Sequence, residues 1–587
     1  MFHCVFTSSF LLLCHLAELG QAGNEQSAPA VPPGQEKLSG SEGLTRGQQN
    51  KLAEIVNGDP KGADNKPLKG KELMKKTGGK LFSTNGKEED LNEVASIIAA
   101  NIANVEAKLK KEYDDSYAKN KGLIDKARND ATKLNAKPLM DNHEELDIAH
   151  INAAHGMEQV LVHGDVSMPV EGLKKLFGVD GASRTKRQAY YDSLYPSTIW
   201  KTGVYWNFDA ALNQAARSAV LSAIAFWQQN TCIRFYQADP ATSVNRPVIV
   251  FYAGSGCFSP VGRSTSSSIQ YVSIGTGCES VNLWKVFPVM KESLGLWHAQ
   301  SRFDRSSFVT VDFTNIMAGM AHNYDAQTSS TNNNYGLTYD YRSVMHYRPG
   351  DFAANTSKPV MYSLNSAYQM SIGYQQLPSF TDIAVLNKHY SCYDKCNANA
   401  TVCYYGGFPN PNSCTVCQCP SGFGGNDCSQ RQPPSTGLTC GTILTSTTAW
   451  QYLTVNNTVG TGQYVIGNVT SPLHCTYHIT APTGYRIQYA VVTVGFDANP
   501  NALCYDSCYY GGLSVKGLDP SWRPEGMRFC CSSQYNQVLT TASNRLVLQP
   551  WNLYHYTDFK FDQFDGGGME RNVDYTLLVY LLSNKLM

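Results

Sequence analysis

Two short blocks of the sequence hold side chains that could bind a metal or take part in catalysis. The first is Leu294–Arg305 (LGLWHAQSRFDR), which contains Gly295 and His298. The second, about forty-five residues further on, is Ser343–Tyr347 (SVMHY). Neutral imidazole is a common metal ligand in proteins. An isolated histidine is more often a surface or buried structural residue, so the significance of His298 depends on what surrounds it.

The two blocks resemble parts of the astacin family of secreted zinc metalloendopeptidases. The first is similar to the tail of that family's zinc motif, HExxHxxGxxH, and the second to its Met-turn. The resemblance implies zinc as the cofactor, His298 as the third zinc ligand and Gly295 as the glycine that ends the helix. It implies Met345 as the Met-turn methionine and Tyr347 as a stabiliser of the transition state.

The front of the motif is absent. In the same register Pro288 takes the place of the first ligand, Val289 that of the general base and Glu292 that of the second ligand. Two histidines at i and i+4 share one helix face and can reach one metal, and the glutamate polarises the metal-bound water. Between His163 and His298 there is no histidine, so no register restores HExxH. With His298 and Glu292 alone, the chain falls short of three zinc ligands.

Two explanations remain open: a pseudoprotease, or an error in the sequence across codons 279–298. A proline inside a core helix costs about 3 kcal/mol, so Pro288 favours an error, as does the interval from Cys278 to His298, which is about two residues longer than the family's. Ala299 favours loss of function. The family usually has a glutamate there that anchors the N-terminus freed by propeptide removal.

The N-terminal third differs in composition from the rest of the chain. Residues 23–187 carry 25 basic and 25 acidic side chains and no cysteine, whereas residues 188–587 carry 23 and 22, with sixteen cysteines. Net charge near zero in both parts gives no electrostatic basis for binding nucleic acid or an anionic membrane. Between Leu91 and Leu134 the apolar residues recur at helical spacing, which predicts a solvated amphipathic helix pair.

The first residues predict secretion and processing. Residues 1–22 are typical of a signal peptide, because the apolar run from Cys4 to Ala17 is too short for a membrane anchor. Residues 184–187 (RTKR) look like a proprotein convertase site, which makes 23–187 a propeptide cleaved after Arg187. The sequence 163–166 (HGDV) resembles the astacin prodomain motif, and this assigns Asp165 as the zymogen latch. N-glycosylation sequons are found at Asn355, Asn399, Asn456 and Asn468.

The remaining cysteines group into modules in an oxidising compartment. Six between Cys396 and Cys428 resemble an EGF-like module at 393–430; a zinc knuckle is disfavoured because about 35 residues need covalent staples. Residues 440–585 have the pattern of a β-sandwich and resemble a CUB domain. The resemblances imply the disulfides Cys232–Cys392, Cys257–Cys278, Cys396–Cys414, Cys403–Cys417 and Cys419–Cys428, and place Cys440 and Cys475 in the CUB domain. Cys504, Cys508, Cys530 and Cys531 should form two further bonds of open pairing.

Taken together, the resemblance implies a multidomain α+β protein. An astacin-like (metzincin) domain at 188–392 is followed by the EGF-like module and the all-β CUB jelly roll. Its implied function is that of a secreted metalloendopeptidase scaffold, made as a zymogen and directed at extracellular or matrix proteins. The alternative is a non-catalytic extracellular binding protein that uses its cleft and its EGF-like and CUB modules. Protein or glycan partners fit both, and neither requires a transmembrane segment.

Overall fold

The computed structural model describes residues 41, 44–77, 83–84, 87–88, 90–139, 146–177, 179, 189, 195–278, 285–329, 332–373, 377–396, 400–447, 450–455, 458–462, 472–496, 499–518, 522–553, 556–557 and 575–582. All of these belong to one unit of the chain, Ser39–Met587. The predicted signal peptide and Arg187 lie outside the described residues. In the part of the chain described, no helix is long and apolar enough to cross a bilayer.

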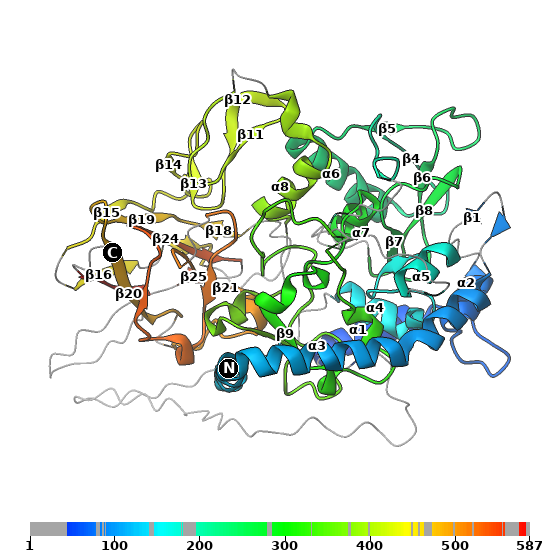
Figure 1. Ribbon diagram of the computed structural model, residues 1–587, viewed down its shortest axis with the longest axis horizontal. Helices are drawn as coiled ribbons and strands as arrows, with labels where there is room; N and C mark the ends of the chain where they lie inside the picture. The colour runs from blue at the N-terminus through cyan, green and yellow to red at the C-terminus, as the bar shows by residue number, and fades with distance from the viewer. Residues whose placement is uncertain are drawn as a thin grey trace, which may run out of the picture. The chain divides into compact units, whose positions relative to one another are not determined.

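The N-terminal region is mainly helical. Its elements are α1 (Arg46–Asn57), α2 (Gly70–Thr77), β1 (Ser83–Thr84), β2 (Lys87–Glu88), α3 (Leu91–Leu134), α4 (Ile148–Ala154), β3 (Val166–Ser167) and α5 (Val170–Phe177). Figure 1 shows α3 passing β9 (Val309–Val311), with which it is in contact. The predicted helical segment is therefore present, as two helical stretches that meet at the non-helical backbone of Asn120. The prediction that it is solvated is wrong, because it buries Val94, Ile98 and Val105.

The central domain is built on a mostly parallel sheet. Its strands run in the order β3-β7-β8-β6-β4-β5, in which β7 and β8 are antiparallel. Their bounds are β4 (Val204–Phe208), β5 (Phe235–Gln237), β6 (Val248–Tyr252), β7 (Cys257–Pro260) and β8 (Ile269–Ile274). The edge strand β3 comes from the N-terminal region, and its Val166 and Ser167 pair with Ser259 and Pro260. The N-terminal region is thus part of the domain's sheet.

Helices and a short ribbon complete this domain. They are α6 (Gln214–Asn230), α7 (Val286–Ser293), α8 (Phe380–His389) and the antiparallel pair of β9 with β10 (Met361–Ser363). Asn213 caps α6 through its side chain, which is a favoured role of asparagine. Phe287 of α7 packs its ring 5.0 Å from that of Phe226 on α6, centre to centre. These contacts fix α7, and hence the residues that follow it.

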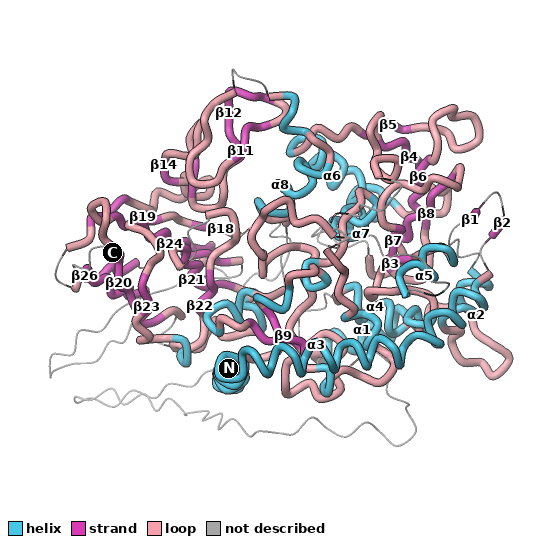
Figure 2. The backbone as a smooth tube through the Cα atoms, in the orientation of Figure 1, coloured by secondary structure: helices cyan, strands magenta, loops and turns pink. Residues whose placement is uncertain are grey.

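The C-terminal part is rich in strands, as the tube in Figure 2 shows. A small module contains β11 (Phe408–Asn410), β12 (Ser413–Gln418), β13 (Phe423–Gly424) and β14 (Gln430–Arg431). After it, two sheets form a β-sandwich, with strand orders β15-β19-β24-β21-β22, joined by β18, and β16-β26-β20-β23; β17 pairs with β25. Their bounds are β15 (Ile443–Thr445), β16 (Gln451–Val455), β17 (Val459–Gly460), β18 (Leu473–His474), β19 (Tyr477–Thr480), β20 (Arg486–Thr493), β21 (Gly511–Lys516), β22 (Met527–Phe529), β23 (Leu539–Thr540), β24 (Arg545–Asn552), β25 (Tyr556–Thr557) and β26 (Tyr575–Leu582).

Eight disulfides staple the three parts. The central domain has Cys232–Cys392 and Cys257–Cys278, and the small module has Cys396–Cys414, Cys403–Cys417 and Cys419–Cys428. The β-sandwich has Cys440–Cys475, Cys504–Cys531 and Cys508–Cys530. The pairing that the sequence left open is therefore 504 with 531 and 508 with 530. A disulfide content this high is typical of the secretory pathway.

Candidate metal centre

Helix α7 and the turn after it position two candidate ligands. Every residue of α7 is buried, including Glu292. The helix ends at Ser293, and the turn after it contains Gly295, whose φ of +97° is strained for other residues; a Cβ there would lie 3.0 Å from Nε2 of His389. The Gly295 amide donates to the carbonyl of Glu292. This tight turn brings His298 back toward the carboxylate of Glu292.

Candidate metal-ligand atoms of three buried side chains converge at this point. Nε2 of His298 lies 2.7 Å from Oδ1 of Asp165 and 3.3 Å from Oε1 of Glu292. One ligand atom from each residue lies within 4.8 Å of the other two. Apart from this ion pair, neither carboxylate oxygen of Glu292 has a hydrogen-bond partner among the described groups, although the side chain is fully buried. A buried carboxylate without partners is costly, so the arrangement fits a cation or a proton shared among the three.

The electrostatics of this cluster point the same way. Burial, reinforced by repulsion from the Asp165 carboxylate, raises the pKa of Glu292 well above its usual range. Burial by itself would lower the pKa of His298. The charge of Asp165 and a hydrogen bond to it, together with the nearby Glu292, instead raise the pKa of His298 to about 10. The cluster therefore retains protons when no metal is bound.

The positions of the missing ligand and base hold apolar side chains. Pro288 and His298 face the same small cavity of about 70 Å³, together with Asp165 and Tyr347. Val289 is completely buried and can neither ligate a metal nor accept a proton. Because α7 begins at Val286, Pro288 lies in the first helical turn, where its missing N–H breaks no intrahelical bond. The expected cost of a proline inside the helix therefore does not arise, and this argument for a sequence error is lost.

The second block lies beside His298. The Ala299 amide donates to the carbonyl of Met345, 2.8 Å away, and the Tyr347 amide donates to Oε1 of Gln300 at 3.0 Å. The rings of His298 and Tyr347 are 4.9 Å apart. The Tyr347 hydroxyl has no hydrogen-bond partner among the described groups, and burial raises its pKa well above the usual value. It is therefore a protonated donor without a partner, beside the candidate ligands.

The segment 163–165 of the N-terminal region closes the site. Gly164 has φ +77°, and a Cβ there would lie 2.8 Å from the Tyr347 hydroxyl, so only glycine fits. Its amide donates to Oδ1 of Asn323, and its carbonyl accepts from Nδ2 of Asn152, each at 2.8 Å. Next to it, the Ser259 amide of β7 donates to the carbonyl of Asp165. Asp165 is thus held by strand pairing as well as by His298.

Two groups that support this segment had no signal in the sequence. One is Asn152, whose side chain also bonds both the amide and the carbonyl of Cys257, at 2.8 and 2.7 Å. The other is the ion-pair network of Asp147 with Arg348 and of Arg348 with Asp351. About two hundred residues separate Asp147 from Arg348, so no local pattern could reveal the network. The arginine already pairs with both carboxylates, which argues against a second metal site.

Other predicted residues have mixed outcomes. Asn355 is exposed and therefore accessible to glycosylation, whereas Asn399, Asn456 and Asn468 lie outside the described residues.

Ala189, two residues after the predicted cleavage site, is already buried and forms a β-bridge with Leu296. The start of the predicted mature chain therefore approaches the turn before His298 without cleavage.

Comparisons with known proteins identify relatives of the central domain. The family model for Astacin, a peptidase family, matches residues 192–391. The zinc metalloproteinase nas-31 of Caenorhabditis elegans is 34% identical over 432 residues, or 72% of this chain and 66% of that protein. Its relative nas-29 is 34% identical over 385 residues, or 65% of this chain and 68% of that protein. The chain belongs to the astacin family.

The astacin domain thus occupies the centre of the chain and is followed by a disulfide-rich β region, as the fold class predicted. Among solved structures, high choriolytic enzyme 1, a hatching enzyme zinc-protease of the medaka Oryzias latipes, is 24% identical. That match covers 34% of this chain and 98% of the other, with a TM-score of 0.31. The chain spans only about two thirds of nas-31 and nas-29.

Zinc is the metal expected of an astacin, and its fit here depends on the N-terminal region. One imidazole nitrogen and two carboxylates, all buried, form an acceptable donor set for a divalent cation. Without Asp165 only Glu292 and His298 remain. The astacin domain by itself therefore does not fit a catalytic zinc site, which normally has three protein ligands.

Proposed function

We propose that this astacin-family chain is a secreted precursor directed at extracellular or matrix proteins, and that its astacin domain binds them without hydrolysing them. The proposed organisation is a signal peptide (1–22), a propeptide (23–187), the astacin domain (188–392), an EGF-like module (393–430) and a CUB domain (440–585). The proposed loss of catalysis rests on the side chain of Val289. It stands where the family has its base, and it is a fully buried apolar side chain.

The chemistry of the site supports this proposal. When bound, zinc would supply a Lewis acid that activates water, and Asp165, Glu292 and His298 are the residues that would hold it. The carboxylate of Glu292 is a ligand candidate in this arrangement, so it is not available as the base. Tyr347 can donate a hydrogen bond, but donation alone does not generate a nucleophile. We therefore derive no hydrolytic step for this chain.

The second candidate function is that of an active peptidase, and the contact of segment 163–165 with the site favours it. Asp165 still reaches His298 at 2.7 Å, and Gly164 still fits against Tyr347, as a zymogen of an active enzyme would require. Activity would need a base and a further ligand in place of Val289 and Pro288. Sequencing the transcript across codons 279–298 tests this directly: a HExxH there would establish the peptidase, and the present codons would exclude it.

The biochemical test uses the full chain cut after Arg187 and then separated from the cleaved propeptide, so that Asp165 is absent from the site. Zinc per chain is measured by plasma mass spectrometry, and turnover with a quenched-fluorescence peptide library. We expect less than one zinc per chain and no turnover above the background of the uncut precursor. One zinc per chain together with chelator-sensitive cleavage would overturn the non-catalytic proposal.

A further inference from the structure

Helix α3 of the N-terminal region is bound to the astacin domain by charges at positions far apart along its length. Glu112 accepts from the guanidinium of Arg305 at 2.7 and 2.9 Å. Sixteen residues further on, Arg128 donates to Asp312 at 2.6 Å. Arg305 is 1% exposed, so its ion pair with Glu112 lies at the edge of a core rather than on an open surface. Burial strengthens such a pair, and loss of one partner is costly.

An apolar stripe of α3 packs into a core cluster of the astacin domain. Val105 and Leu109 are buried in one cluster with Val309, Tyr324 and Tyr347 of the astacin domain. Burial of two aliphatic side chains contributes about 3–6 kcal/mol. The N-terminal region therefore does more than present Asp165. Its helix covers a core surface that includes the aromatic residue beside His298.

The segment that directly follows α3 reaches the C-terminal β-sandwich. The Lys137 amide donates to the carbonyl of Cys504 at 2.9 Å, and the Asp506 amide donates to the carbonyl of Lys137 at 3.0 Å. Leu139 is buried in a cluster with Tyr509 and Tyr510 of the sandwich. One continuous segment, 91–139, thus contacts both the astacin domain and the sandwich.

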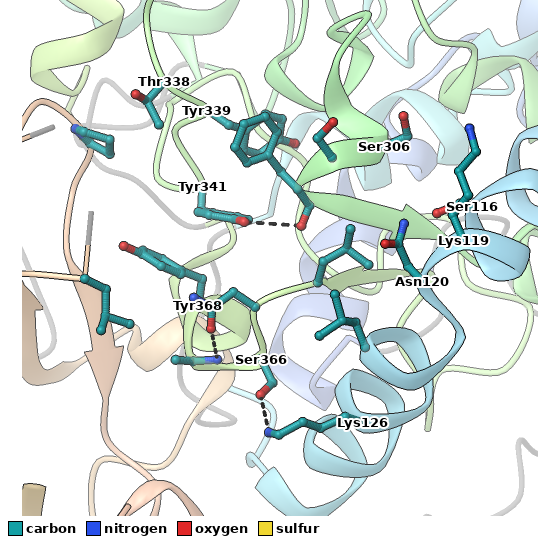
Figure 3. Close-up of a pocket in the computed structure, with 18 of the residues that line it drawn as sticks. Ser116, Lys119, Asn120, Lys126, Ser306, Thr338, Tyr339, Tyr341, Ser366 and Tyr368 are labelled. Carbon is teal, nitrogen blue, oxygen red and sulfur yellow. Dashed lines mark hydrogen bonds between the residues drawn. The ribbon is translucent and has the colours of Figure 1, made fainter. Parts of the chain in front are cut away.

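Figure 3 shows the junction at which the three parts meet. A groove of about 1370 Å³ has Ser116, Lys119 and Lys126 of α3 on one side. Tyr339, Tyr341 and Tyr368 of the astacin domain lie on the other side, and the Lys126 ammonium donates to the Ser366 hydroxyl. Leu518 and Leu539 of the β-sandwich also line the groove. Without α3, the two modules would keep only their mutual contacts at this groove.

We propose that residues 91–139 are a bivalent internal partner that stays bound to the astacin domain and the β-sandwich after cleavage at Arg187, so that the processed protein is a non-covalent complex. The inference rests on the proposed processing. Its basis is that the segment makes two separate contacts, one with the astacin domain and one with the β-sandwich. Release requires both contacts to be open at once, and while one is closed the two partners of the other remain at high effective concentration. Cleavage alone would then not empty the site, and a second event would be required to displace the propeptide.

The test follows the propeptide after cleavage. The purified full chain is cut with a convertase and run on a sizing column at about 1 μM, near physiological salt. We expect the propeptide to co-elute with the rest, and its elution as a separate species would overturn the proposal. If the convertase does not cut, the proposed processing fails. A variant in which 184–187 is replaced by the site of another sequence-specific protease still tests the complex.

Single substitutions separate the two contacts. Glu112→Gln should weaken retention at the astacin domain by about thirtyfold or more. Its control is Asp114→Asn, since Asp114 pairs with Lys110 on an exposed face of the same helix; about threefold at most is expected. Leu139→Ala should speed dissociation from the β-sandwich, and Leu221→Ala, at a half-exposed position of α6, should not. Equal dissociation rates for Leu139→Ala and wild type would overturn the bivalent attachment.

A salt titration of the wild type covers the case in which a variant is not secreted. The Glu112–Arg305 pair is largely buried, and salt screens buried pairs much less than exposed ones. Retention should therefore persist at about 1 M salt, where the Debye length is about 3 Å. Loss of retention at that salt would show that exposed charges, and not these contacts, hold the propeptide.

Discussion

Glu292 Oε1 lies 3.3 Å from Nε2 of His298, across the turn made by Gly295. The two side chains meet as the family's second and third zinc ligands would, but one of them is a carboxylate, and the first ligand and the base are absent. What completes the set is Asp165, from the N-terminal region. The N-terminal region was expected only to block the site, but through Asp165 it also supplies one of the candidate metal ligands.

Metal retention should therefore depend on Asp165. The Asp165→Ala precursor should bind zinc at least about tenfold more weakly than the wild type, since even the loss of a residue supporting a ligand costs about 10–100-fold. Zinc content after dialysis against a calibrated chelator measures the difference. Asp147→Asn, which alters the neighbouring ion-pair network without removing a donor of this cluster, is the matched control. Equal zinc content in Asp165→Ala and wild type would show that the donors do not act together.

Parts of this site followed from the sequence, and parts could not. His298, Met345 and Tyr347 lie in short blocks with their own spacing, so their proximity was predictable. Asn152 and Arg348 depend on pairing across a hundred residues or more, for which a single sequence holds no local signal. The strands at 248–252 and 269–274 could be predicted because they are apolar runs. The burial of α3 could not, since its charges are typical of a solvated face, although Glu112 and Arg128 pair with the astacin domain.

Restoring the motif should restore the chemistry. The triple variant Pro288→His, Val289→Glu and Glu292→His places two histidines at i and i+4 on α7, with a glutamate between them. We expect it to bind one zinc per processed chain and, once the propeptide has been removed, to cleave peptides at least about a hundredfold above background. The double variant that keeps Val289 is the control, and it should bind zinc without turnover. An inactive triple variant that holds zinc would show that the cleft has changed in more than its ligands.

The buried ion pair of Lys291 with Asp382 should matter for stability. Asp382 also accepts from the Ser343 hydroxyl and the Val344 amide, so it ties α7 and α8 to the Met-turn. Lys291→Ala leaves a carboxylate buried and should lower the free energy of unfolding by about 3–5 kcal/mol. The exposed pair Lys110 and Asp114 provides the comparison, because Lys110→Ala should cost less than about 1 kcal/mol. Urea unfolding followed by fluorescence gives both values, and similar losses in the two variants would contradict this account.

Acid should destabilise the astacin domain through His346. Its Nδ1 lies 2.7 Å from the Tyr347 carbonyl and its Nε2 lies 2.7 Å from the Tyr339 hydroxyl, so the neutral ring can donate at Nδ1 and accept at Nε2. Burial lowers the pKa of His346 to about 4, below its ordinary value of 6.5. A lowered folded-state pKa means that the unfolded state binds the proton first as the pH falls.

The stabilisation that His346 contributes is therefore complete above its ordinary pKa of 6.5 and declines as the pH falls toward about 4. The loss over this range is up to about 3 kcal/mol. We compare the unfolding free energies of wild type and His346→Gln near neutral pH and at about one pH unit above the folded-state pKa of about 4. The difference between the two proteins in pH dependence measures the stabilisation that His346 contributes. The glutamine keeps polar atoms near Tyr339 and the Tyr347 carbonyl but cannot take up the proton. Equal pH dependence in the two proteins would show that His346 does not titrate on unfolding.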